Sequence, residues 1–188
     1  TNDTGRLFRV GEEGTGVLNI SATGSFASSG NAVTLGNTAA GNGTINLNGG
    51  SLQARQLLGG PGAGTVNFNG GVLRVGANPN VNFITGLTAA NVMAGGAVID
   101  TGANNVGIGQ ALLDGGGNGG LTKQGTGALY LNGVNTYAGT TLVSAGCDVD
   151  AQDQDGNTPL ITAILHGHAA PVELLLAVGA DIAIARLD

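Results

Sequence analysis

The chain has 188 residues, enough to bury a substantial core, and its formal net charge is −6. This acidic balance, without a basic stripe, excludes nucleic acid as a partner, and no run of 18 apolar residues is present to insert into a membrane. A single cysteine excludes an internal disulfide framework. Of the 37 glycines, 34 lie in the first 147 residues and three in the remainder, so the composition changes abruptly near residue 147.

The N-terminal segment combines a short apolar strand with clustered charge. Leu7, Phe8 and Val10 predict the strand, and four charged residues crowd around it: Arg6, Arg9, Glu12 and Glu13. Charges beside an exposed strand edge oppose edge pairing. The sequence starts at Thr1 and shows neither an initiator methionine nor a signal peptide, so we expect a trimmed chain. A trimmed first coil exposes unpaired backbone, and we therefore expect self-association through this end.

Residues 14–119 repeat short segments in which apolar and polar residues alternate. Thr44–Gly50 (TINLNGG) is followed 21 residues later by Thr65–Gly71 (TVNFNGG). The alternation predicts strands with one buried face, and the side chains expected to point inward are Ile45, Leu47, Val66 and Phe68. Asn46 and Asn67 then point outward at matching positions, where we expect an amide ladder. Looser copies of the pattern occur at residues 16–20, 97–100 and 128–132.

Strands that recur every 20 to 30 residues, with few aromatic residues and many Gly, Asn and Thr, predict a β-solenoid. Gly-Gly and Asn-Gly pairs supply its corners. A β-sandwich also explains the alternation, but a sandwich does not require nearly identical sequence at successive strands.

Residues 120–146 have the sequence GLTKQGTGALYLNGVNTYAGTTLVSAG. This segment closely resembles the passenger-associated transport repeat of bacterial autotransporters. The resemblance rests on these positions: Gly120, Leu121, Lys123, Gly125, Gly127, Leu129, Leu131, Gly133, Asn135, Thr136, Tyr137, Gly139 and Gly146. It implies a mainly β fold, a right-handed parallel β-helix at the bacterial surface, and a repeat associated with secretion and folding. The preceding coils resemble ordinary passenger sequence.

A four-residue motif near the C-terminus recurs 33 residues later: Gly146-Cys147-Asp148-Val149 returns as Gly179-Ala180-Asp181-Ile182. The period and the motifs between the copies resemble one ankyrin repeat. The resemblance is carried by Gly156, Thr158, Pro159, Leu160, Gly167, His168 and Gly179. It predicts helices at residues 159–166 and 171–178. The side chains expected on their inward face are Leu160, Ala163, Ile164, Val172, Leu175 and Leu176.

A single ankyrin repeat does not bury its apolar face alone, so we expect this helical hairpin to act as a C-terminal cap on the solenoid. The predicted domains are therefore residues 1–146, a passenger-like β-solenoid, and residues 147–188, an ankyrin-like cap. The cap stands where further passenger sequence is expected. Both a designed fusion and a natural recombination would produce this seam.

The tail offers three candidate chemical sites. One is an acidic run before Gly156, made of Asp148, Asp150, Asp153 and Asp155. An EF-hand register on this run places Ala151 and Thr162 where calcium ligands are needed, so the calcium hypothesis fails. His166 and His168 lack a third metal ligand, and Cys147 lacks an assigned base. We therefore predict no metal, no cofactor and no catalytic residue.

The solenoid also offers little for catalysis. The glycine clusters at residues 59–64 and 115–120 lack the Gly-Lys-Ser/Thr ending of a phosphate loop and are predicted to be coil corners. Asp100 and Asp114 are the acids in the middle of the solenoid, whereas polysaccharide-cleaving enzymes need clustered carboxylates.

The sequence therefore predicts a non-enzymatic, adhesin-like passenger fragment, extracellular or at the bacterial cell surface. Besides a second copy, its expected partner is a protein or a surface ligand. The alternatives are an interaction scaffold that uses the ankyrin-like segment, and a β-helix enzyme that acts on polysaccharide.

Overall fold

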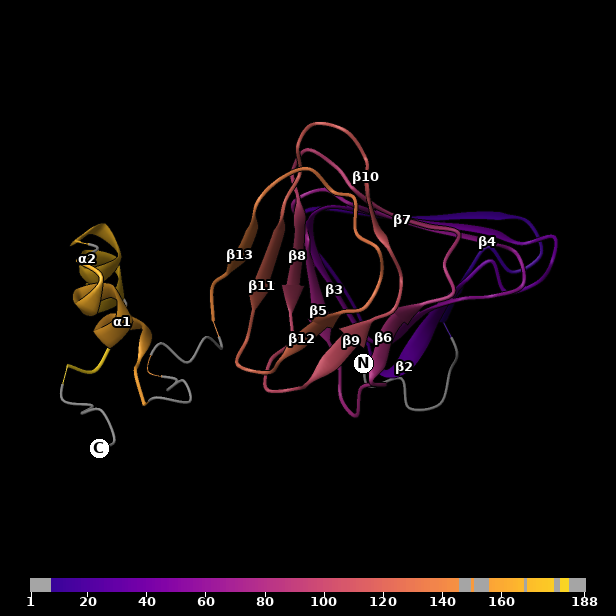
Figure 1. The fold of residues 1–188 in the computed structure, drawn as a ribbon. Coiled ribbons are helices and arrows are strands. Elements are labelled where there is room, and N and C mark those ends of the chain that lie inside the picture. Colours follow the sequence, from indigo (N-terminus) through magenta and orange to yellow (C-terminus); the bar gives the residue numbers. More distant parts are fainter. Residues whose placement is uncertain (1–7, 146–149, 151–155, 168, 178–179, 183–188) are drawn as a thin grey trace. The chain divides into compact units, whose positions relative to one another are not determined.

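All strand pairs that the structure describes are parallel, as expected when one chain winds repeatedly around a common axis. The computed structural model describes residues 8–145, 150, 156–167, 169–177 and 180–182 (Figure 1). The chain separates into two units, residues 1–146 and 147–188, and each is described by itself. The parallel pairing confirms the solenoid over the sandwich, because a sandwich is built from antiparallel strands.

The described residues of the first unit form thirteen strands in one continuous sheet. They are β1 (Phe8–Val10), β2 (Thr15–Leu35), β3 (Asn42–Gly59), β4 (Ala63–Phe68), β5 (Val72–Val75), β6 (Asn82–Thr85), β7 (Ala89–Val92), β8 (Ala97–Asp100), β9 (Val106–Ile108), β10 (Leu112–Asp114), β11 (Leu121–Gln124), β12 (Leu129–Leu131) and β13 (Thr141–Val143). The long strands β2 and β3 bend around the corners, which is why a single sheet covers all sides of the solenoid.

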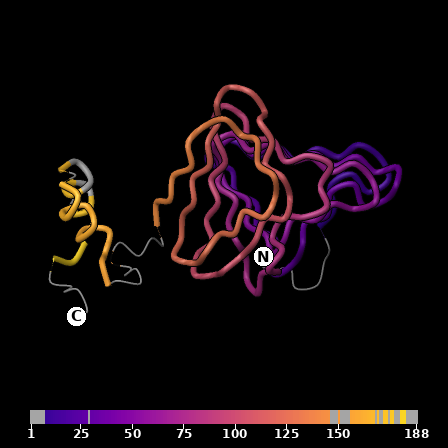
Figure 2. Tube along the Cα trace, viewed as in Figure 1, coloured from indigo at the N-terminus to yellow at the C-terminus, as the bar shows by residue number. Residues whose placement is uncertain are grey.

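The pairing register defines three faces. Face A stacks residues 15–22 of β2, residues 42–48 of β3, and then β4, β7 and β10. Face B stacks residues 25–28 and 51–54, and then β5, β8, β11 and β13. Face C stacks β1, residues 32–35 and 56–59, and then β6, β9 and β12. Figure 2 shows the successive coils lying on one another.

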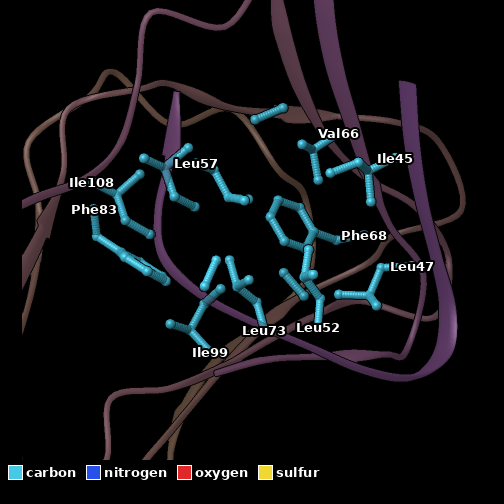
Figure 3. Close-up of a cluster of buried hydrophobic side chains, with 14 of the residues drawn as sticks. Ile45, Leu47, Leu52, Leu57, Val66, Phe68, Leu73, Phe83, Ile99 and Ile108 are labelled. Carbon is cyan, nitrogen blue, oxygen red and sulfur yellow. The ribbon is translucent and has the colours of Figure 1, made fainter. Parts of the chain in front are cut away.

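Apolar side chains from the three faces fill the interior in columns that follow the register. On face A, Ile45 lies beside Val66, and Leu47 beside Phe68; all four side chains are fully buried, as the alternation predicted. Leu57 lies beside Ile84 on face C. Figure 3 shows Leu57, Val66 and Phe68, with the other labelled side chains, pointing toward one another inside the winding chain. Each such side chain contributes about 1.5–3 kcal/mol of burial free energy, so stacked coils stabilise one another.

The looser sequence copies are not all equivalent in space. Residues 16–20 lie on face A with the two close copies, but residues 97–100 belong to face B and residues 129–131 to face C. Alternation reports that one side of a strand is buried, and it carries no information about which face the strand belongs to.

The second unit contains helices α1 (Pro159–Leu165) and α2 (Ala169–Ala177). The Thr158 side-chain oxygen accepts a hydrogen bond from the Ile161 backbone N–H, which caps α1, and Pro159 occupies the first turn, where no N–H is needed. α2 begins two residues earlier than predicted, with Pro171 in its first turn. Proline is tolerated there because the first four N–H groups of a helix have no intrahelical partner.

Within this unit, the helix pair buries only part of the predicted inward face. Leu160 and Ala163 are buried, and Val172 and Leu175 are half-buried. Ile164 and Leu176, which were also predicted to point inward, are 59% and 47% exposed. Two helices of seven and nine residues cover one narrow stripe of each other, and side chains beyond that stripe stay in solvent.

Within the described part of the chain, neither helix is long and apolar enough to cross a membrane.

Candidate functional site

Four asparagine side chains form a continuous hydrogen-bonded ladder along face A. The Asn46 amide nitrogen donates to the side-chain oxygen of Asn19 at 2.7 Å, and Asn67 donates to Asn46 at 2.7 Å. Asn91 donates to Asn67 at 2.8 Å. The ladder predicted for Asn46 and Asn67 is therefore confirmed, and it extends one coil further in each direction.

The strand register explains the ladder. Asn19, Asn46, Asn67 and Asn91 are direct partners in consecutive strands, and each stands between two inward-pointing side chains. A second, shorter file lies two residues along, where Asn69 donates to the side-chain oxygen of Asn48 at 3.1 Å. Asn91 alternates with the buried Ala90 and Val92, as its partners do with their own neighbours, but it was not predicted from the sequence as a member. Only the strand register places it in the ladder, because alternation does not show which face a strand belongs to.

Lys123 is buried in the interior of the coil that carries the transport-repeat resemblance. Its register partner is Ile99, whose side chain points inward, and Lys123 is only 6% exposed. The ammonium donates to the backbone oxygens of Gln124 at 3.4 Å, of Gly125, and of Ala145 at 2.9 Å. A buried charge is tolerated only where such hydrogen bonds replace water. Lys123 therefore connects the corner after β11 to the segment after β13.

Two glycines of this repeat hold the corner against the preceding coil. Gly125 has a φ of +81°, which side chains rarely adopt. The N–H of Gly127 donates to the Gly102 oxygen at 2.8 Å, and a Cβ at Gly127 would lie 2.0 Å from the Asn104 oxygen. Thr101 is fully buried in this corner, and its hydroxyl donates to the Gly127 oxygen at 2.9 Å.

The remaining residues of the repeat make contacts within their own coil or with neighbouring coils. The Asn135 side-chain oxygen accepts from the Leu112 N–H at 2.9 Å, and the Thr136 N–H donates to the Leu112 oxygen at 2.9 Å. The Tyr137 hydroxyl lies 2.6 Å from that of Thr141. Three leucines pack in or on the apolar core: Leu121, Leu129 and Leu131. Three glycines lie against the backbone of neighbouring coils: Gly120, Gly133 and Gly139. Gly146 lies outside the described residues.

The two acids of the middle coils have structural contacts and are not a carboxylate pair on one strand. Asp100 accepts from the Arg74 guanidinium at 2.7 Å across face B and from the Gly102 N–H at 3.0 Å. Asp114 ends β10 on face A and accepts from the Gly116 N–H at 2.8 Å. Among the described residues, no group of three His, Cys, Asp or Glu side chains is placed to hold a metal ion. The glycine clusters at residues 59–64 and 115–120 lie at corners between strands, as predicted.

The described ankyrin-motif residues lie at the two ends of α1. Thr158 caps the helix, Leu160 is buried, Gly156 is buried just before the cap, and Gly167 follows the C-cap residue His166. The Asp181 N–H, in the second copy of the four-residue motif, donates to the carboxylate of Asp150, which follows the first copy, at 2.8 Å. The other predicted positions of this segment lie outside the described residues: Cys147, Asp148, Asp153, Asp155, His168 and Gly179. The cap, the scaffold alternative and the expected absence of a metal site there stay predictions.

At the N-terminal end, β1 pairs with residues 33–35 of β2, and the Phe8 ring lies 4.4 Å from the Phe26 ring. Arg9 forms an exposed ion pair with Glu12 at 2.5 Å, and Glu13 is exposed. Arg6 and Leu7 lie outside the described residues. Self-association at this end stays a prediction.

Comparisons with known proteins bear out both resemblances. Residues 121–146 match the family described as Passenger-associated-transport-repeat, and residues 155–186 match the Ankyrin repeat. The chain is 34% identical over 100 residues to a protein named Adhesin BmaC autotransporter, from Brucella suis biovar 1 (strain 1330). That match covers 53% of this chain and 3% of the relative, so the chain spans a small fraction of the relative's length. No solved structure matches the chain.

Proposed function

We propose that this chain is part of a non-enzymatic passenger that is exported to the bacterial surface and acts there as an adhesin. The observation that carries the proposal is the β-solenoid ending in a coil that matches the passenger-associated transport repeat. The adhesive role comes from the partial similarity to a protein named as an autotransporter adhesin.

The chemistry of the described residues supports a binding role over a catalytic one. Asp100 is engaged by Arg74, and Asp114 by a backbone N–H. Lys123 is turned inward onto carbonyl oxygens. Hydrolysis of a glycosidic bond requires two carboxyl groups facing one bond, and these contacts use the acids of the middle coils for structure.

The test is display of the full chain on a bacterium that lacks adhesins. The chain is placed between a signal peptide and the membrane barrel of an unrelated autotransporter. Antibody labelling of intact cells measures export, and resistance to added protease measures folding. Adherence to cultured host cells and to matrix-coated surfaces then measures function.

We expect labelled, protease-resistant chain at the surface and more adherent cells than with the barrel alone. The matched control is Gly127→Ala, which disrupts the last coil and should reduce both protease resistance and adherence. A folded, surface-exposed chain that adheres no better than the barrel alone would contradict the adhesin role. A wild-type chain retained inside the cell would contradict the passenger role.

A further inference from the structure

From β2 to β7, the outward side of face A carries an uncharged array of amides and hydroxyls, here called the amide array. Its members are Asn19, Asn46, Asn67 and Asn91 in the central file, Thr44 and Thr65 on one side, and Asn48 and Asn69 on the other. All are half-buried or exposed. The array crosses four consecutive coils, and none of its members carries a charge.

The ladder uses only part of the hydrogen-bonding capacity of each amide. An asparagine side chain has two N–H donors and an oxygen with two lone pairs. Asn46 donates one N–H to Asn19 and accepts one hydrogen bond from Asn67. Asn67 donates one N–H to Asn46 and accepts one hydrogen bond from Asn91. Each of these two amides therefore keeps one donor and one acceptor position for a molecule outside the ladder.

The ladder also fixes the amides in a regular row. Neighbouring parallel strands lie about 4.8 Å apart, so equivalent amides repeat at that spacing along the solenoid axis. Side chains that are already held by hydrogen bonds lose little conformational entropy when a ligand binds. A rigid row of paired donors and acceptors suits an extended ligand whose own hydrogen-bonding groups repeat along its length.

The composition of the array selects the class of ligand. A sulfated or carboxylated polymer needs Arg or Lys, and the array has neither. A protein partner favours a centre rich in aromatic and apolar side chains, and the central file consists of asparagine. The hydroxyl groups of a neutral ligand both donate and accept hydrogen bonds, so they can pair with the amides and threonine hydroxyls of the array without any charge on either side.

We propose that the amide array binds a neutral, hydroxyl-rich polysaccharide that lies along the solenoid axis. The inference deepens the proposed adhesin function, on which it rests, by naming the class of surface ligand. Polysaccharide is held and not cleaved there, because the array contains no carboxylic acid.

The experiment is native gel electrophoresis of the full chain in gels that contain one dissolved polysaccharide. Hydroxyethylcellulose, laminarin and galactomannan are the neutral probes, and heparin and alginate are the anionic ones. The blocking variant is Thr65→Lys, which places a long charged side chain beside the ladder without removing a ladder amide. Its matched control is Thr122→Lys, the same exchange at an outward, half-buried threonine of face B.

We expect at least one neutral polysaccharide to retard the wild-type chain, with about a tenfold weaker affinity for Thr65→Lys and an unchanged affinity for Thr122→Lys. Circular dichroism melting checks that both variants remain folded. If Thr65→Lys does not fold, Thr44→Gln and Thr65→Gln replace it, since they fill the same strip without charge.

Three results would each overturn the proposal. They are no retardation by any neutral probe, retardation by heparin or alginate alone, and equal weakening by the face A and face B variants. If no neutral polysaccharide retards the chain but the displayed chain still promotes adherence, the adhesin function is supported and only the assignment of a polysaccharide ligand is wrong.

Discussion

The side-chain amide of Asn67 donates to the side-chain oxygen of Asn46 at 2.7 Å, and this bond joins two coils that are 21 residues apart in sequence. Because Asn67 also accepts from Asn91, it is an interior link of the ladder. Each link adds a polar contact to a stack whose inner side is held by apolar burial.

Asn67→Ala should therefore lower stability by about 2 kcal/mol, since it removes two hydrogen bonds worth about 1 kcal/mol each and leaves Asn46 and Asn91 without their partner. Urea unfolding followed by circular dichroism measures the change. The control is Asn42→Ala, at an exposed position of the same residue type for whose side chain the structure describes no hydrogen bond; it should change stability by less than about 0.5 kcal/mol. Equal losses in the two variants would show that the ladder adds nothing.

The ladder was predictable because two nearly identical segments set both the register and the side of the strand. Lys123 was not predictable as an inward residue. Thr122, Lys123 and Gln124 are all polar, so this stretch lacks the alternation of apolar and polar residues that distinguished inward from outward positions around Asn67. Its burial depends on the carbonyl oxygen of Ala145, which the next coil brings into reach across 22 residues. Contacts of that kind follow from the winding and not from the local pattern.

Ile164 and Leu176 are a different case. Helical spacing placed them with Leu160 on one face, and the helix pair by itself leaves both exposed. Spacing identifies the side of a helix that can be buried, but the width of the covered stripe depends on the size of the partner. The ankyrin resemblance implied that a single repeat needs a neighbour to bury its apolar face, and the helix pair by itself leaves these two side chains exposed.

Lys123→Met should lower stability by about 1.5–3 kcal/mol, because methionine keeps much of the side-chain volume but leaves three carbonyl oxygens without their charged donor. The loss should be local. Hydrogen exchange should accelerate most at the amide of Ser144, which donates to the Lys123 oxygen, while the amides of β4 and β7 change little.

The control for this lysine is Arg74→Met, which removes a half-exposed cation from an ion pair with Asp100 and should cost less than about 1 kcal/mol. If Lys123→Met is as stable as the wild type, packing of the methionine against its register partner Ile99 compensates for the lost hydrogen bonds. The buried lysine then has no stabilising role.

Thr158→Ala should weaken α1 by about 1 kcal/mol, since it removes the side-chain oxygen that accepts the N–H of Ile161. Hydrogen exchange at Ile161 should accelerate about fivefold, in proportion to that free energy. Thr162→Ala, at an exposed position inside the helix, is the control and should leave this amide unchanged or slower to exchange. Thr158→Ser should restore the wild-type rate; if it does not, loss of the buried methyl group and not of the cap explains the effect.

Gly127→Ala should be the most damaging single-methyl change in the transport-repeat coil. The added Cβ would lie 2.0 Å from the Asn104 backbone oxygen and 2.4 Å from its carbonyl carbon, so backbone must move and the hydrogen bond from the Gly127 N–H to the Gly102 oxygen is strained. We expect a loss of about 3 kcal/mol or more, measured by thermal unfolding, with early cleavage by protease near residues 125–131.

Gly109→Ala is the matched control, because nothing lies within 4 Å of the Cβ that it would add and the φ of Gly109 is not in the positive range. That variant should be neutral or slightly stabilised, since alanine restricts the unfolded chain. If the two variants melt at the same temperature, the close approach of coils at Gly127 does not limit the stability of the last coil.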